Sequence, residues 1–252
     1  MQETWAITLA LPHEAKAIVP KGMAYTQTLY QGFRILEFEA QDKKILLLQT
    51  GVGLKRARQA TRFLLENFKL SRLISTGYCG ALHSQLKTGD LVLASTVVAN
   101  TASALPLSTD PAWTEESLKL LSQNQSWKVH RGNLLSSLHP LLNPIEKQAL
   151  AIKYDGIAVD MESHGVLQAA QKLEIPKLVL RFVIDELKDN LEEVESLLEP
   201  HSQSQAGRLL SESIKRPKLL TRLPFLAIKA HQARENLKKS FQLLLKNSTP
   251  QA

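Results

Sequence analysis

The chain has 252 residues, of which 44% are hydrophobic and 22% are charged, a profile typical of a globular protein. It contains one cysteine, Cys79, which excludes an intramolecular disulfide framework and fits a reducing compartment. No uncharged apolar run approaches the roughly 20 residues needed to cross a bilayer. The first residues lack the basic start and small-residue cleavage site of a secretory signal, so we expect a cytoplasmic protein.

The formal net charge of +7 is unevenly distributed along the chain. Residues 215–246 contain nine of the 31 Lys and Arg residues and one of the 24 acids, so this segment carries +8 and the remainder −1. No aromatic stacking pattern accompanies the bases, so a nucleic-acid partner is not expected. We predict one domain over residues 1–214 and a basic helical tail over 215–252.

Apolar runs broken by glycine and proline predict strands that alternate with helices. Such alternation favours an α/β fold with a mixed, mostly parallel central sheet and helices on both faces, a three-layer α/β/α architecture. The predicted strands are 5–11, 27–40 (with a turn at Gln31-Gly32), 44–49, 73–76, 90–99, 127–135, 157–159 and 178–184. The predicted helices are 54–68, about 114–122, one capped by Asn143, 162–172, and the end from 205 with a break at Pro217 or Pro224; loops are expected at 77–82 and 100–112.

Three groups of carboxylates lie where predicted strands end, which is where open α/β sheets bind their ligands. Glu14 follows the first strand, Asp160 and Glu162 follow a later one, and Asp185 ends the last. An acid at the end of a buried strand is desolvated on one side, which raises its pKa toward the range useful for a general acid. Each acid taken singly could instead cap a helix or form a surface ion pair.

Two glycine-containing loops, at 50–53 and 76–80, each follow a predicted strand. Glycine lets backbone N–H groups approach an anion or a flat ring, but neither loop matches a dinucleotide or ATP pattern, and strand-to-helix turns use glycine anyway. Cys79 has no evident histidine partner, which favours packing over a nucleophilic role. The seven histidines lack metal-ligand spacing, so we expect no metal and no other cofactor, with phosphate possible only as a co-substrate.

Taken together, these segments resemble the nucleoside phosphorylase/nucleosidase superfamily, the fold of purine and uridine phosphorylases. Residues 47–93 are similar to that superfamily's glycine loop, helix and TG-containing strand end, followed by its L-K-x-G-D stretch. Residues 155–189 are similar to its V-E-M-E ribose motif followed by the catalytic R-x-x-x-D. This second pair of motifs is specific, whereas the glycine loops alone are not.

The resemblance implies a role for each matching position. Asp185 would protonate the purine at N7, Glu162 and Met161 would hold the ribose, and Glu14 would activate an attacking water. Arg181 would brace the strand that carries Asp185. Such a set suits an oxocarbenium-like transition state, which needs an acid on the leaving group and carboxylates near the developing positive charge. The other pocket residues implied by the resemblance are Asp160, Gly51, Gly53, Gly77 and Gly80.

Within the superfamily, the chain looks similar to the hopanoid-associated phosphorylase group, which removes adenine from adenosylhopane. The shared features are H-E-A-K around Glu14, V-D-M-E-S-H at 159–164, L-R-x-V-x-D at 180–185 and a basic, leucine-rich C-terminal extension. His164 is interpreted either as a pocket residue or as a helix-packing residue. Nucleosidases have an aromatic under the purine where this chain has Ser137-Leu138-His139-Pro140, so Tyr78 or Phe182 is expected to supply the stacking.

The expected reaction is cleavage of the N-glycosidic bond of a purine nucleoside with release of adenine, from adenosylhopane in hopanoid biosynthesis. Glu14 favours water as the nucleophile, while the name of the similar group favours phosphate, so both stay open. The alternatives are a methylthioadenosine/S-adenosylhomocysteine-type nucleosidase and a nucleoside-binding protein without turnover. The resemblance also implies a homo-oligomer.

An apolar stripe with bases on its flanks runs along the tail at helical spacing. It is predicted to pack on the domain or on a second subunit, or to make peripheral membrane contact through residues 215–246. A lipid-linked substrate would require work at the bilayer surface, where bases near anionic lipid add roughly 1 kcal/mol each. The stripe consists of Leu219, Leu223, Leu226, Ala230, Ala233, Leu237, Phe241 and Leu244.

Overall fold

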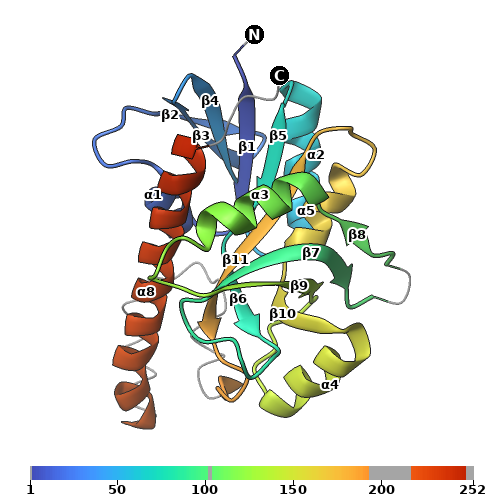
Figure 1. The fold of residues 1–252 in the computed structure, drawn as a ribbon, viewed down its shortest axis with the longest axis vertical. Coiled ribbons are helices and arrows are strands. Elements are labelled where there is room, and N and C mark those ends of the chain that lie inside the picture. The colour runs from blue at the N-terminus through green and yellow to red at the C-terminus, as the bar shows by residue number, and fades with distance from the viewer. Residues whose placement is uncertain (1, 102–103, 193–216, 248–252) are drawn as a thin grey trace.

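A computed structural model describes residues 2–101, 104–192 and 217–247, with only the backbone of 217–226 and 247 (Figure 1). The helices are α1 (Pro12–Ile18), α2 (Leu54–Asn67), α3 (Pro111–Leu121), α4 (Pro144–Tyr154), α5 (Ser163–Ala169) and α8 (Pro217–Asn247). The strands are β1 (Thr4–Leu9), β2 (Thr26–Tyr30), β3 (Phe33–Ala40), β4 (Lys43–Gln49), β5 (Arg72–Ser75), β6 (Tyr78–Ala81), β7 (Leu91–Ala99), β8 (Leu107–Ser108), β9 (Val129–Ser136), β10 (Gly156–Asp160) and β11 (Lys177–Asp185).

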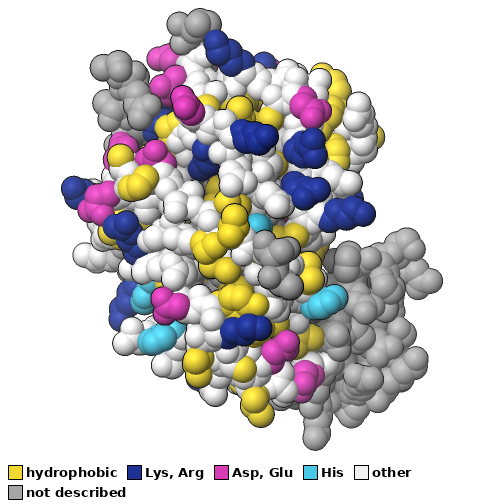
Figure 2. Space-filling model, turned by 90° about the vertical axis from the view of Figure 1, so that its right-hand side faces the viewer, with side chains coloured by type: hydrophobic (Ala, Val, Ile, Leu, Met, Phe, Trp, Pro, Cys, Tyr) yellow, Lys and Arg dark blue, Asp and Glu magenta, His cyan; other side chains and the backbone are white. Residues whose placement is uncertain are grey.

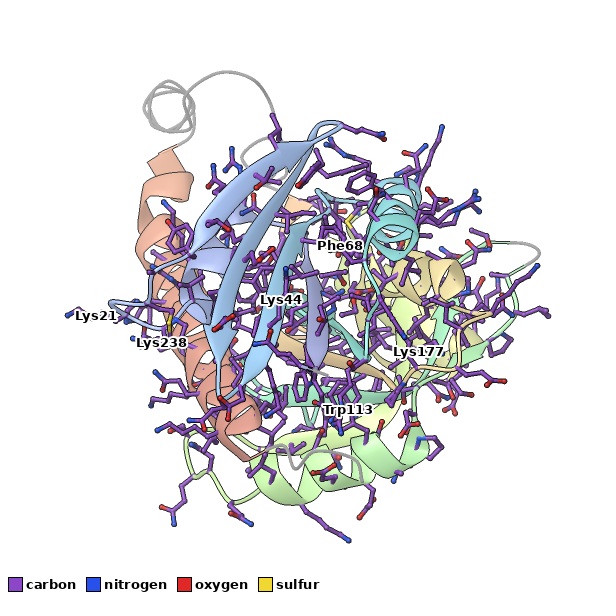
Figure 3. The ribbon with its side chains drawn as sticks, turned by 90° about the horizontal axis from the view of Figure 1, so that it is seen from above. Lys21, Lys44, Phe68, Trp113, Lys177 and Lys238 are labelled. Atoms are coloured by element: carbon purple, nitrogen blue, oxygen red, sulfur yellow. The ribbon has the colours of Figure 1, made fainter. Side chains whose placement is uncertain are left out.

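These strands form one sheet in the order β2-β3-β4-β1-β5-β11-β6-β10-β9-β7-β8. Parallel pairs such as β1–β4 occur beside antiparallel pairs such as β3–β4, which confirms the mixed sheet of the predicted α/β class. The central strand β1 explains why helices cover both faces, because successive side chains of a strand point to opposite sides. Trp5 and Ile7 belong to a hydrophobic cluster with α8, whereas Ala6 belongs to a cluster with α2. Seen from above, α8 lies on one side of the strands and α2 on the other (Figure 3).

Strand β11 joins the open part of the sheet to a closed ring of strands. Its residues 177–179 pair with β5, residues 180–182 pair with β7, and the end of the strand pairs with β6. The pairs β6–β10, β10–β9 and β9–β7 complete the ring. The carboxyl end of β11 is therefore enclosed by other strands, which fixes the position of its last residue, Asp185.

Two local features differ from the sequence-based expectation, and a third agrees with it. The predicted loop at 77–82 contains β6, whose sequence Tyr-Cys-Gly-Ala is too short and too small-sided to carry a strand pattern. Helix α1 directly follows β1, where the sequence predicts the strand to continue to residue 11. The predicted strand at 27–40 is a hairpin that turns at Gln31 and Gly32, both with positive φ, so the predicted turn is confirmed.

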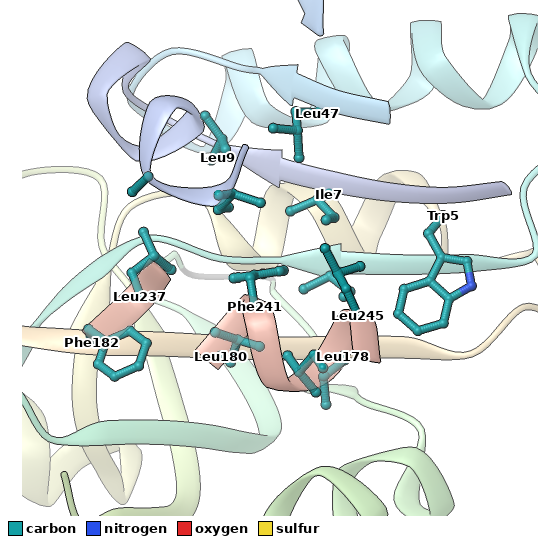
Figure 4. Packing of buried hydrophobic residues seen from close by; sticks show 14 of the residues in the cluster. Trp5, Ile7, Leu9, Leu47, Leu178, Leu180, Phe182, Leu237, Phe241 and Leu245 are labelled. Carbon is teal, nitrogen blue, oxygen red and sulfur yellow. The ribbon is translucent and has the colours of Figure 1, made fainter. Parts of the chain in front are cut away.

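The C-terminal helix packs into the core of the domain. Ala233, Leu237, Phe241 and Leu244 are buried in the same cluster as Trp5, and Figure 4 shows the helix side chains above β11. The membrane-facing interpretation is wrong for this half of the stripe, because the sheet covers these side chains. Leu219, Leu223 and Leu226 lie outside the described side chains.

The helix spans Pro217–Asn247 and continues through Pro224, so the alternative of a break at Pro224 is wrong. The segment before Pro217 lies outside the described residues. Among the described residues, no helix is both long and apolar enough to cross a membrane.

Helix α4 presents apolar side chains to solvent. Ile145 and Ile152 are 77% and 85% exposed, and Leu105 and Leu138 are exposed as well. Figure 2 shows the side of the molecule on the right of Figure 1, where hydrophobic side chains form a band along the middle of the surface. Exposed apolar patches are common at protein–protein contacts, so this surface agrees with an oligomer, which stays a prediction.

The packing of α8 predicts that Leu237→Ala destabilises the whole domain. Leu237 is fully buried, so its truncation should lower the free energy of unfolding by about 2–5 kcal/mol in a denaturant titration. Gln242→Ala, at an exposed position of the same helix, is the matched control and should change stability by less than about 0.5 kcal/mol. Equal stability of the Leu237→Ala and wild-type proteins would contradict a core role for α8.

Candidate active site

A cavity of about 350 Å³ lies at the carboxyl ends of β1, β10 and β11, within the size range of small-molecule sites. Glu14, Asp160, Glu162 and Asp185 all line it. The structure thus brings the three predicted groups of strand-end carboxylates into one wall. Much of the remaining wall is apolar and includes Val52, Leu141, Leu142, Ile184, Leu191 and Ala230.

Arg181 on β11 is 1% exposed and lies beneath three of these acids. Its Nη2 atom forms an ion pair with Asp160 Oδ2 at 2.7 Å and donates to Ser75 Oγ at 3.0 Å and Ser163 Oγ at 2.9 Å. Its Nη1 atom donates to the carbonyl oxygen of Thr76. Burial alone would lower the pKa of the guanidinium, but the neighbouring carboxylates, Asp160 foremost, raise it above its ordinary value. The predicted bracing role of Arg181 has this physical basis.

Glu14 lies in the first turn of α1 and is 2% exposed. The backbone N–H of Leu11 donates to its Oε2 atom at 2.7 Å. Burial raises the pKa of Glu14 to about 7, although the Leu11 hydrogen bond and Arg181 oppose the rise. Gly77, with φ of +135°, has no room for a side chain, since a Cβ there would lie 2.6 Å from Glu14 Oε1. Gly77 therefore leaves the space that the Glu14 carboxyl group occupies, but it does not line the cavity.

Glu162 is the N-cap residue of α5 and accepts a 3.0 Å hydrogen bond from the backbone N–H of Gly53. Burial and the neighbouring Asp160 raise the pKa of Glu162 to about 7, while Arg181 opposes the rise. Met161 lines the cavity beside these acids. Gly53 thus contributes to the site through its N–H group.

Asp185 ends β11, and its carboxyl group stands over Gly80 of β6. A Cβ at Gly80 would lie 2.7 Å from Asp185 Oδ2, so only glycine leaves space for the carboxyl group in this position. Lys147 of α4 forms a buried ion pair with Asp185 Oδ2. Burial raises the pKa of Asp185, and the charge and hydrogen bond of Lys147 oppose the rise.

Besides Gly77, three more of the predicted pocket residues are absent from the cavity wall. Phe182 is fully buried in the core, edge-on to Trp127 at 5.6 Å, because it points to the opposite side of β11 from Arg181. His164 lies in α5, and its Nε2 atom is 3.0 Å from the carbonyl oxygen of Leu105. This contact agrees with the helix-packing interpretation of His164. Gly51 faces Arg56, whose Nε atom would lie 2.9 Å from a Cβ at this position.

Tyr78 lines the cavity and is the aromatic that remains for base stacking. Its ring stacks on His13 with centroids 5.7 Å apart and an interplanar angle of 19°. Burial raises the pKa of the Tyr78 hydroxyl, which has no hydrogen-bond partner among the described residues. Burial also lowers the pKa of His13. The phenol and the imidazole both therefore favour their neutral forms.

Sequence reasoning missed Lys147 and the wall formed by residues 139–142. Lys147 is fully buried, whereas the apolar Ile145 and Ile152 of the same helix are exposed, so hydrophobic periodicity points away from the lysine. No signal in the sequence marks it. Within the part of the chain that the structure describes, no group of three or more His, Cys, Asp or Glu residues could hold a metal ion.

The buried acids predict a stability that falls as pH rises. The folded protein holds the pKa of Glu14 at about 7, against an ordinary value of 4.5, so between these values the folded state binds more protons than the unfolded state. The free energy of unfolding must therefore decrease across this window. One pKa unit is worth about 1.4 kcal/mol. The free energy of unfolding of wild type should therefore fall by roughly 3 kcal/mol more than that of Glu14→Gln between about pH 5 and about pH 8.

Urea titrations at the two pH values measure this difference. Glu66→Gln, at an exposed position, serves as the control and should follow wild type. Parallel losses in Glu14→Gln and wild type would mean that Glu14 is ionised at low cost.

The chain is similar to known proteins in both sequence and structure. The profile of the phosphorylase superfamily matches residues 4–215. The 5'-methylthioadenosine/S-adenosylhomocysteine nucleosidase of Bacillus thuringiensis (strain Al Hakam) is 24% identical over 196 residues, 71% of this chain and 84% of the relative.

Two solved structures from Helicobacter pylori share the fold. Futalosine hydrolase of strain 26695 has a TM-score of 0.78 at 16% identity, covering 98% of this chain and 99% of its own. A 5'-methylthioadenosine/S-adenosylhomocysteine nucleosidase has a TM-score of 0.73 at 19% identity, covering 96% and 99%. Because the matching profile spans most of the chain, this protein is an enzyme that belongs to the phosphorylase superfamily.

Proposed function

We propose that this enzyme hydrolyses the N-glycosidic bond of a purine nucleoside. The observation that carries the proposal is the set of four carboxyl groups, Glu14, Asp160, Glu162 and Asp185, in one largely apolar cavity at the carboxyl ends of the strands. N-ribosyl cleavage needs an acid for the departing base and negative charge near the ribose as positive charge develops. The names of the relatives, which are nucleosidases and a hydrolase, support the same reaction class.

The acids divide the work of the proposed reaction between the two ends of the bond. Asp185, whose pKa is raised by burial, delivers a proton to N7 of the base. Glu162 accepts hydrogen bonds from the ribose hydroxyls. Glu14, with a pKa of about 7, takes the proton of the attacking water. A carboxyl group with this pKa is suited to general-base work near neutral pH.

The charge of the cavity favours water over phosphate as the nucleophile. Four acids line the cavity, and no Lys or Arg is among the described residues of its wall. A phosphate dianion entering it would face these carboxyl groups without a cation to bind it. Arg181 lies close by, but its guanidinium is occupied by Asp160 and by backbone and hydroxyl acceptors.

The apolar part of the wall supports a substrate with an apolar 5' substituent, of which adenosylhopane is the one that we propose. Leu141, Leu142, Ile184 and Leu191 form this part, together with Ala230 of α8. A triterpenoid is larger than the cavity, so its bulk would have to extend out of it. A soluble methylthioadenosine/S-adenosylhomocysteine-type substrate is the second candidate, which the names of the relatives favour.

Replacing the proposed general acid Asp185 with a residue that cannot donate the proton should abolish most of the turnover. Asp185→Asn keeps the shape of the side chain, so calorimetric binding of adenine should persist while adenine release falls about 100-fold or more. Asp42→Asn is the matched control, because Asp42 lies in an exposed turn with φ of +61°, a conformation that Asn tolerates. Unchanged turnover in Asp185→Asn would refute the assignment.

The nucleophile and the substrate can be identified in one series of assays. Adenosine, methylthioadenosine and adenosylhopane in detergent are each incubated with and without phosphate, and both products are quantified. We expect free sugar in all reactions, a rate independent of phosphate, and the highest kcat/KM for adenosylhopane. Formation of a ribose 1-phosphate product would show that the reaction is phosphorolysis and not hydrolysis. A preference for methylthioadenosine would favour the second candidate substrate.

A further inference from the structure

Lys147 is the feature of the site that neither the sequence motifs nor the proposed roles account for. It lies in the first turn of α4, which Asn143 caps by accepting the N–H of Ile145 at 2.8 Å. Its side chain is 0% exposed although it carries an ammonium group. A buried charge is costly unless it is paired and hydrogen-bonded, so its partners define what it does.

The ammonium group has two partners on one short segment. It forms the ion pair with Asp185 Oδ2 and donates to the carbonyl oxygen of Glu186 at 3.2 Å. Lys147 does not line the cavity, whereas Asp185 does. The ion pair with Asp185 therefore links the lysine to the cavity wall.

The segment that follows Asp185 is tied to α4 at further points. The N–H of Leu191 donates to the carbonyl oxygen of Leu142 at 2.9 Å, and Asn143 Nδ2 donates to Glu192 Oε1 at 2.9 Å. The orientation of Asp185 thus depends on the placement of α4, and Lys147 makes the direct contact between them.

The same segment is also held from the opposite side. Asp189 accepts the N–H of Glu186 at 2.8 Å and forms an ion pair with Lys229 of α8. Lys87 forms a 3.3 Å ion pair with Glu186. These contacts remain when Lys147 is changed, whereas the ion pair with Asp185 and the hydrogen bond to the carbonyl oxygen of Glu186 are lost.

We propose that Lys147 is a positioning residue for the reaction, which orients the Asp185 carboxyl group and stabilises the carboxylate left after its proton passes to the base. This inference rests on the proposed function, and it names a residue that makes the general acid stronger. The lysine needs no contact with the substrate to act in this way.

The charges around Asp185 explain why such a partner is required. Burial raises the pKa of this carboxyl group, and a carboxyl group that holds its proton too tightly is a poor acid. Asp189 raises the pKa further, and Cys79 of β6 adjoins the group. Two positive charges lower the pKa of Asp185, and Lys147 lowers it more than Lys229 of α8 does.

The proposed step balances in atoms and charge. The O–H bond of Asp185 breaks as an N–H bond forms at N7, and the C1'–N9 bond breaks with its electron pair passing to the base. Water forms the new C1'–O bond and gives its proton to Glu14. The base leaves neutral, and Asp185 remains as a carboxylate beside the ammonium group of Lys147. After product release Asp185 takes up a proton from solvent and Glu14 gives its extra proton to solvent.

The test compares Lys147→Met, Lys147→Gln and Lys147→Arg with wild type in kcat/KM–pH profiles for adenine release. In the two neutral variants we expect kcat to fall about tenfold or more, with KM changed less than about threefold. Loss of the positive charge raises the pKa of Asp185, so the alkaline limb of the profile should move to higher pH. Lys147→Arg keeps the charge and should retain most of the activity.

A double variant separates this role from a purely structural one. In an Asp185→Asn background the general acid is already absent, so adding Lys147→Gln should cause no further loss of kcat. Thermal unfolding of each variant identifies any that fail to fold, and the comparison of Lys147→Gln with Lys147→Arg stands without Lys147→Met.

Three results would overturn the inference. These are an unchanged kcat in Lys147→Gln, an alkaline limb that stays in place, or losses that multiply in the double variant. Failure of the proposed function gives a different result, because wild type itself would then release no base from any nucleoside.

Discussion

The site depends on one guanidinium group, that of Arg181, which allows three carboxyl groups to be buried at one point. A buried carboxylate without a partner is strongly destabilising, and Glu14, Asp160 and Glu162 all lie in the field of this cation. Asp160 takes the direct ion pair and accepts the hydroxyl of Ser136 at 2.5 Å. Glu14 and Glu162 have no direct ion pair with Arg181. Its charge lowers their pKa values less than burial raises them, so the pKa of each is about 7.

The fold delivers that arrangement through β11. This strand runs along the open sheet and then enters the ring formed with β6 and β7, and its register with β6 shifts between Val183 and Asp185. Arg181 and Asp185 are consequently held by different neighbours, at the start and the end of the ring. The R-x-x-x-D spacing therefore places, on one continuous strand, a cation paired with Asp160 and an acid in the cavity wall.

Much of this could be predicted from sequence, because strand ends and their acids are local features. Glu14, Asp160, Glu162 and Asp185 each follow an apolar run, and the carboxyl ends of parallel strands meet at one edge of a sheet.

What could not be predicted depends on contacts between distant segments. Phe182 and Arg181 are neighbours in the chain but point to opposite sides of β11, and the register that decides this is not visible in a run of apolar residues. The burial of Lys147 could not be predicted, because α4 exposes its apolar residues Ile145 and Ile152 and buries a lysine, the reverse of the usual pattern. The buried ion pair with Asp185 gives that inversion a reason.

Arg181 and Lys147 together explain how an acidic cavity can exist without a cation in its described wall. Each cation is paired with a carboxyl group of the wall, Arg181 with Asp160 and Lys147 with Asp185, and neither cation itself lines the cavity. An oxocarbenium-like state is positive and is favoured by that surface, whereas an anionic nucleophile is not. The same placement that permits burial of the acids thus also supports the proposed neutral nucleophile.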